Sequence, residues 1–153
     1  MSAASIDLVL ELIDAGHLAV SRAGLLALGA PPAGRPVDFD RVEGMLLGLA
    51  IGDALGNTSE GRSPTERRAA HGEVRDYLPN WYAARRSVGL PSDDTQLAFW
   101  TLEHLLEHGR IVPDRLAELF VRRRIFGIGR TVRAFVAAFN AGQPWEKAAT
   151  ACR

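Results

Sequence analysis

Glycine recurs at every fourth position of one apolar run, in the stretch GMLLGLAIGDALG at residues 44–56. Glycine costs a helix interior roughly 1 kcal/mol relative to alanine, so Gly48 and Gly52 need a compensating gain. A spacing of four places both glycines on one face of a helix, where a neighbouring backbone can approach closely. We therefore expect a closely packed helix over residues 39–55. Its core would be completed by large apolar side chains: Met45, Leu46, Leu49 and Leu55.

The same spacing of small residues occurs where membrane helices pair, but this run is short and contains Asp53. No uncharged apolar run reaches the roughly 18 residues that a membrane-spanning helix needs. The N-terminus carries acidic residues and no basic segment, unlike a secretory signal. These features favour a soluble, cytoplasmic protein without a membrane partner.

The net charge and the cysteine count exclude further classes of protein and of site. Eighteen basic and eighteen acidic side chains cancel, so no global field favours nucleic acid as a partner. One cysteine, Cys152, excludes an internal disulfide and any multi-cysteine metal site.

Helical periodicity runs through most of the chain, and no alternating strand pattern of any length appears, so the predicted fold class is all-α. A first helix is expected from Ser5, as its N-cap, to a stop at Gly16, followed by a second apolar stretch at 18–30. The segment PPAGRP at 31–36 reads as a linker. We therefore divide the chain into a helical appendage with its linker at 1–37 and a main region at 38–153.

Further helix ends can be read from capping residues. Asp40 and Glu43 have the spacing of a capping box at the start of the glycine-rich helix. Other helices are expected near 63–71, from 93 to a stop at Gly109, from Pro113 to about 124, at 129–142 and from 144 onward. The segment 76–91 reads as a long irregular loop.

Acidic residues lie at the ends of two of these helices. Asp53 should be paired or hydrogen-bonded, because burying an unpaired carboxylate is very costly. If Gly56 ends the helix, the polar loop that follows carries Glu60 close to the same terminus.

The stretch SDDT at 92–95 allows two interpretations. Ser92 can cap the helix, with Asp93 and Asp94 complementing the helix dipole. Alternatively, a hydroxyl and two adjacent carboxylates fan towards one point and offer the oxygen ligands that Mg²⁺ or Mn²⁺ prefers. His104 and His108 lack the glutamate that a zinc protease motif requires, so a surface histidine pair is expected there.

Taken together, GMLLGLAIGDALG, the following Glu60, SDDTQLA and GIGRTVRAFVAAFNAGQPWEKAA resemble the ADP-ribosylglycohydrolase family. The resemblance runs from about Asp40 to Arg153 and implies an all-α, orthogonal helical bundle. It implies two Mg²⁺ or Mn²⁺ ions and cleavage of the glycosidic bond that joins ADP-ribose to a protein side chain or small acceptor.

The resemblance also implies roles for individual residues. Glu60 and Asp94 would be catalytic, and Ser92, Asp93 and Asp94 would bind metal, with Ser92 standing where the family usually has threonine. Asp53 and Thr95 would be structural or would orient the metal ligands.

Two motifs of the family have no counterpart in this sequence: a C-terminal Asp-x-Asp-Ser/Thr stretch that completes the metal site, and a Gly-Asn-Gly loop that contacts ADP-ribose. The resemblance thus covers an N-terminal part of the bundle, incomplete at its C-terminus, which a separate C-terminal half or a second copy would complete. We expect residues 1–153 alone to bind metal weakly, to turn over little or not at all, and to expose an apolar face. The alternatives are a non-catalytic descendant that binds ADP-ribose or a protein, and a purely structural helical module.

Overall fold

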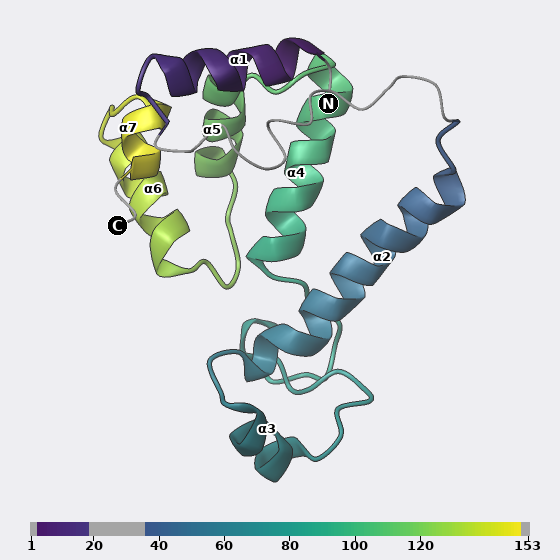
Figure 1. Cartoon of the computed structure of the whole chain (residues 1–153). Helices are drawn as coiled ribbons and strands as arrows, with labels where there is room; N and C mark the ends of the chain where they lie inside the picture. Colours follow the sequence, from purple (N-terminus) through teal and green to yellow (C-terminus); the bar gives the residue numbers. More distant parts are fainter. Residues whose placement is uncertain (1–2, 19–35, 151–153) are drawn as a thin grey trace. The chain divides into compact units, whose positions relative to one another are not determined.

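The computed structural model describes residues 3–18 and 36–150 (Figure 1). In chain order, its elements are α1 (Ala3–Asp14), α2 (Phe39–Gly56), the 3₁₀ turn η2 (Asn57–Ser59), α3 (Pro64–His71), the 3₁₀ turn η3 (Trp81–Ala83), α4 (Asp93–His108), α5 (Pro113–Arg122), α6 (Arg130–Asn140) and α7 (Trp145–Thr150). Across these residues no strand forms, apart from one isolated bridge between Pro79 and Ser87. The all-α prediction is confirmed.

Most predicted helices are present, and glycines end them as expected. Gly16, Gly109 and Gly142 follow α1, α4 and α6 with positive φ, a conformation that glycine adopts without a Cβ penalty. Pro113 begins α5 at its first helical position. The apolar stretch at 18–30 and most of the linker at 31–36 lie outside the described residues.

Two predicted N-caps are wrong. Ser5 lies inside α1, which begins at Ala3. Asp38, not Asp40, caps α2, because its extended backbone lets its carboxylate accept the Arg41 N–H and pair with that guanidinium at 3.0 Å. Asp40 then falls in the first turn, where Glu43 cannot close a capping box. The chain does form such a box at Ser63 and Glu66, at the start of α3.

The chain divides into two compact units. The first contains α1 and the segments Phe99–Arg124 and Gly129–Arg153, in which α5, α6 and α7 pack side by side (Figure 1). The second, which we call the site unit, comprises Val37–Ala98 and Ile125–Ile128. Helix α4 begins in the site unit and continues in the first.

In the first unit, His104 is a buried structural residue rather than half of a surface pair. It is 2% exposed, and its Nε2 accepts the Val112 N–H at 2.9 Å, which fixes the turn from α4 to α5. Burial lowers the pKa of His104, and the neighbouring His108, whose ring stacks at 4.3 Å, lowers it further. The prediction of a surface pair is therefore wrong for His104, because the turn supplies a donor that only a neutral imidazole can accept.

The buried positions of the site unit are mostly polar. Among its described residues, the buried ones are Ala54, Ser59, Asn80, Ala83, Ser92 and Thr95. A buried polar side chain needs a hydrogen-bond partner, and a cluster of them is more informative than any exposed apolar residue. The site unit is therefore built around a hydrogen-bonded network rather than an apolar core.

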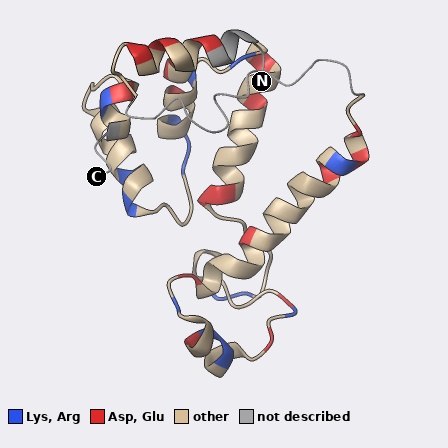
Figure 2. Cartoon of the chain, viewed as in Figure 1, with Lys and Arg blue, Asp and Glu red and all other residues tan. Residues whose placement is uncertain are grey.

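Helix α2 does not have the packing that its glycines predicted. A Cβ built at Gly44, Gly48, Gly52 or Gly56 would meet nothing within 4 Å in the described part of the chain. Met45, expected in the core, is 64% exposed, and Leu47 and Ile51 are also exposed. Figure 2 shows α2 almost without charge between its first turn and Asp53. An exposed apolar face is thus present, as expected, and it lies on α2.

Candidate functional site at the start of helix α4

The carboxylate of Asp53, near the end of α2, is the centre of the polar network. Its Oδ2 accepts the backbone N–H of Ser92 at 2.6 Å, the N–H of Thr95 at 3.2 Å and the Thr95 hydroxyl at 2.6 Å. Its Oδ1 accepts the Ser92 hydroxyl at 2.6 Å and the Asn57 amide at 3.2 Å. One carboxylate therefore receives donors from both the backbone and the side chains at the start of α4.

Asp53 consequently does for α4 what a capping residue does for its own helix. The first N–H groups of a helix lack partners within it, and a side-chain oxygen normally satisfies them from the preceding residue. Here the oxygens come from α2, and Ser92, expected as a possible cap, donates its hydroxyl to Asp53 instead. Burial alone would raise the pKa of Asp53, but the hydrogen bonds from Ser92, Thr95 and Asn57 outweigh it and lower that pKa.

Two asparagines extend the network away from Asp53. The Asn57 amide also donates to the Leu90 carbonyl at 2.9 Å, while its Oδ1 accepts from Asn80 at 3.4 Å. Asn80 is buried, and its Oδ1 accepts the Tyr82 N–H at 2.8 Å at the start of η3. The long loop before α4 is therefore tied to the end of α2 through side chains.

The segment Ile125–Ile128 closes one side of the α4 start. The Phe126 N–H donates to Gln96 Oε1 at 2.7 Å. Gly127 has φ +70°, and a Cβ there would lie 2.8 Å from the Ser92 Cβ and 3.2 Å from Asp93 Oδ1. Glycine is therefore required at 127, both by its backbone conformation and by the closeness of Ser92 and Asp93.

An open cavity of about 510 Å³ at the α4 start brings together part of the predicted site. We call it the acidic cavity. Its polar lining comprises Asp53, Asn57, Glu60, Arg67, Ser92 and Asp94, and Gly52 and Gly56 contribute the glycine face of α2. Glu60 and Asp94 thus share one cavity although they lie on different elements.

Asp93 departs from the prediction that adjacent carboxylates fan towards one point. It does not line the acidic cavity, and its carboxylate lies against Gly127 instead. Successive helical residues are rotated by about 100°, so Asp93 and Asp94 leave the helix start in different directions. Asp93 therefore does not share the acidic cavity with Glu60 and Asp94.

The donor atoms in the acidic cavity are of the right kind for a hard cation, since Glu60, Ser92 and Asp94 all offer oxygen. Their number is not sufficient on its own. Residues 3–18 and 36–150 contain no group of three or more His, Cys, Asp or Glu side chains arranged to hold a metal ion. These residues can supply part of a Mg²⁺ or Mn²⁺ shell, whose remaining positions would need water or other ligands.

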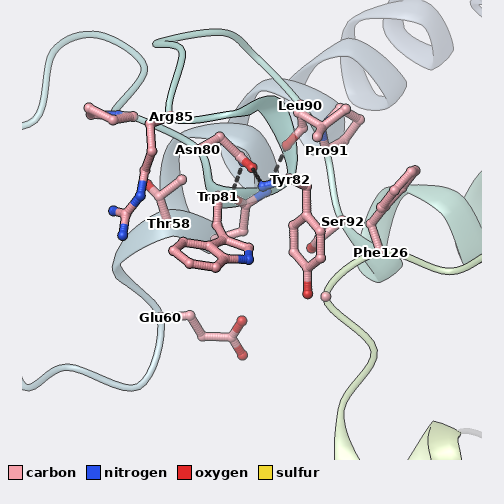
Figure 3. Close-up of a pocket in the computed structure, with 13 residues that line it drawn as sticks. Thr58, Glu60, Asn80, Trp81, Tyr82, Arg85, Leu90, Pro91, Ser92 and Phe126 are labelled. Atoms are coloured by element: carbon pink, nitrogen blue, oxygen red, sulfur yellow. Dashed lines mark hydrogen bonds between the residues drawn. The ribbon is translucent and has the colours of Figure 1, made fainter.

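A second, smaller cavity of about 190 Å³ adjoins the first (Figure 3). We call it the aromatic cavity, because Trp81, Tyr82 and Phe126 line it. It shares Asn57, Glu60 and Ser92 with the acidic cavity. Glu60 therefore faces two cavities of different chemical character.

Comparison with known sequences identifies the family of this chain. The sequence profile described as ADP-ribosylglycohydrolase matches residues 35–152, which is most of the chain. The chain belongs to the ADP-ribosylglycohydrolase family.

One relative is an uncharacterized protein of Archaeoglobus fulgidus, which is 39% identical to this chain over 83 residues. The match covers 54% of this chain and 27% of that relative, so this chain spans about a quarter of the relative's length. No solved structure matches the chain. No described helix combines the length and apolar character that crossing a membrane requires.

Some site residues that sequence reasoning missed had a detectable signal. Asn57 stands four residues after Asp53, a spacing at which helical side chains meet. Gly127 begins the stretch GIGRTVRAFVAAFNAGQPWEKAA, whose resemblance to the family gives no physical reason for the glycine. Nothing local indicated Asn80 or Trp81, because their positions depend on how a loop returns to α2.

Proposed function

We propose that this chain provides the Glu60 and Asp94 part of a site that hydrolyses the glycosidic bond between ADP-ribose and a protein side chain or small acceptor. The observation that supports it is the acidic cavity, which Glu60 and Asp94 line together with Ser92. Family membership supports the substrate class, because glycohydrolase chemistry is what the family's description names.

The proposed roles follow from the chemistry of these side chains. Glu60 accepts a proton from the water whose oxygen bonds to the anomeric carbon, and it then gives that proton to the nitrogen or oxygen whose bond to this carbon breaks. Asp94 and Ser92 present oxygens to a divalent ion, Mg²⁺ or Mn²⁺, which when bound polarises the ribose hydroxyls and the attacking water. Asp93, against Gly127, is assigned to a second ion of the family pair.

Asp53 and Thr95 are positioning residues in this proposal. The Asp53 carboxylate holds the backbone of Ser92 and Thr95, so it fixes the direction in which the intervening Asp93 and Asp94 leave the helix. Groups that orient metal ligands commonly change metal affinity by about 10–100-fold when removed.

A second candidate function is non-catalytic binding of ADP-ribose or of a protein. The specific observation that favours it is the lack of any group of three metal-binding side chains in the described residues. On this alternative the chain binds ADP-ribose without releasing it from an acceptor, and Mn²⁺ has no effect on that binding.

The discriminating experiment measures ADP-ribose release from ADP-ribosylated protein with Mn²⁺ present, together with binding of free ADP-ribose. The protein is the natural gene product that contains this chain, with Asp94→Asn as the test variant. Asp114→Asn is a matched control, because Asp114 also lies in the first turn of a helix, α5.

We expect the rate of ADP-ribose release to fall about 100-fold or more in Asp94→Asn, which is the size of effect seen when a general acid–base group is lost. The rate should be unchanged in Asp114→Asn. Full activity in Asp94→Asn would overturn it. If the protein binds ADP-ribose but releases none from the acceptor, the non-catalytic alternative is favoured. If it neither binds nor releases ADP-ribose, both functions are overturned and a structural helical module remains.

A further inference from the structure

The aromatic cavity presents large aromatic rings to solvent beside Glu60. Trp81 is 72% exposed and Tyr82 is 54% exposed, whereas rings of this size usually bury most of their surface. Figure 3 shows the indole of Trp81 above the Glu60 carboxylate, with Tyr82 beside it and Phe126 beyond. The Tyr82 and Phe126 rings contact each other at a centroid distance of 5.7 Å. The cavity thus has a flat apolar wall and an acidic floor.

The exposed rings are held by a strained turn. Ala84 and Arg85 both have positive φ, at 53° and 64°, a conformation that residues other than glycine seldom adopt. Asn80 stabilises the turn, because its carbonyl accepts the Ala83 and Arg85 N–H groups and its side chain accepts the Tyr82 N–H. Strain that the surroundings enforce in this way clusters at sites that bind ligands.

The turn also places a planar cation on the indole. The Arg85 guanidinium lies 4.7 Å from the centre of the Trp81 ring. This contact shows that the ring accepts a flat, delocalised group against its face, as indole rings favour. The guanidinium occupies one approach to Trp81 and leaves the ring largely exposed.

One polar atom in the cavity lining lacks a partner. The hydroxyl Oγ1 of Thr58 is buried and has no hydrogen-bond partner within the described part of the chain. Thr58 lines the aromatic cavity. A buried hydroxyl without a partner is costly, so a ligand that supplies a donor or acceptor at this point gains affinity.

We propose that the aromatic cavity receives the leaving group of the substrate and selects a planar, delocalised polar group. The leaving group would stack on Trp81 and hydrogen-bond to Thr58. The term leaving group rests on the proposed function, in which Glu60, shared by both cavities, stands where the bond breaks. The volume of about 190 Å³ suits a ring-sized group, and the 510 Å³ acidic cavity is left for the larger part of the substrate. A saturated, flexible alcohol would gain neither contact.

The test titrates the ¹⁵N-labelled 153-residue chain with small probes and follows the tryptophan indole N–H signals by NMR. Nicotinamide is a planar neutral heteroaromatic amide, ethylguanidinium is a planar cation, and propan-1-ol is the saturated control. The Trp81 signal is assigned with Trp81→Phe, and Trp145→Phe in α7 serves as the matched control outside the site unit.

We expect a saturable shift of the Trp81 signal with nicotinamide, ethylguanidinium or both, and none with propan-1-ol. Which planar probe binds more tightly distinguishes a neutral from a cationic leaving group. Because Trp81→Leu and Trp81→Phe lack the Trp81 indole signal, their binding is followed by the backbone N–H signals of Tyr82 and Gly127, which line the same cavity. By that readout Trp81→Leu should bind roughly fivefold or more weakly, as loss of a stacking face does, while Trp81→Phe retains binding. Thr58→Val should weaken it and Thr58→Ser should not.

The inference is overturned if neither planar probe shifts the Trp81 signal, if propan-1-ol shifts it equally, or if Trp81→Leu binds as the wild type does. Asp94→Asn, which removes the proposed hydrolysis, should leave this titration unchanged. A failure of the inference is therefore distinguishable from a failure of the proposed function.

Discussion

Asp53 links two elements through five hydrogen bonds on one carboxylate. Neutral asparagine has the same shape but only one acceptor oxygen, so it leaves donors at the start of α4 without partners. Hydrogen bonds to a charged acceptor are worth about 1.5–3 kcal/mol each, and their losses are not additive. The residue is therefore expected to dominate the stability of the site unit.

We predict that Asp53→Asn lowers the free energy of unfolding of the site unit by about 2 kcal/mol. This is the contribution of one hydrogen bond to a charged group, which the asparagine does not replace. Urea denaturation followed by far-UV circular dichroism measures it. Asp38→Asn is the control, because Asp38 also caps a helix but is well exposed. Equal losses in the two variants would contradict the role given to Asp53.

The same residue sets a pH dependence. Because the pKa of Asp53 is lowered in the folded chain, its contribution is fully present above the unfolded value of 3.8 and is lost as the pH falls below it. Wild-type stability should therefore drop more steeply than that of Asp53→Asn on acidification from about pH 5. Parallel curves of stability against pH for the two proteins would show that the hydrogen bonds to Asp53 do not lower its pKa.

At the level of single residues, part of the site could be predicted from the sequence. That Asp53 must have partners followed from its apolar surroundings, and the structure confirms it. Its partners Ser92 and Thr95 did not follow, because they are placed by the return of a long loop, whereas Asn57 stands only four residues further along the chain. The direction of Asp93 did not follow for the same reason: the sequence contains its adjacency to Asp94 but not the neighbour, Gly127, that Asp93 lies against.

Among the structural elements, helices were predictable and their packing was not. Glycine and proline positions located the ends of α4, α5 and α6, because they restrict backbone conformation locally. The glycine face of α2 was expected to be covered, yet no described residue approaches Gly48. Only Gly52 and Gly56 have a visible use, as lining of the acidic cavity.

The segment Ile125–Ile128 gives a prediction at this scale. Gly127→Ala should destabilise the site unit by roughly 2 kcal/mol, because alanine costs about 1–2 kcal/mol at positive φ and its Cβ would also contact Ser92. Gly129→Ala is the matched control, two residues along, with φ −70° and open space around it. Thermal unfolding compares the two, and a Gly127→Ala protein as stable as Gly129→Ala would show that the segment does not pack on Ser92.

For the whole molecule, the family could be recognised from three motifs in order, and the profile match over residues 35–152 confirms it. The division at residue 37 remains a prediction. The exposed apolar side chains of α2 agree with the exposed apolar face that was expected from the motifs that the sequence lacks. Weak metal binding by residues 1–153 remains a prediction. What the sequence could not provide was the aromatic cavity, since its wall is formed by a loop that had no periodicity to interpret.

If Glu60 and the start of α4 act on one divalent ion, Mn²⁺ binding by the 153-residue chain depends on both, and calorimetric titration measures that binding. We predict weak binding, because a partial oxygen shell leaves the ion largely hydrated, and a further loss of more than about tenfold in both Glu60→Gln and Asp94→Asn. Asp114→Asn should bind as the wild type does. No detectable binding by the wild type, or unchanged affinity in Glu60→Gln or Asp94→Asn, would show that Glu60 and Asp94 do not share a divalent ion.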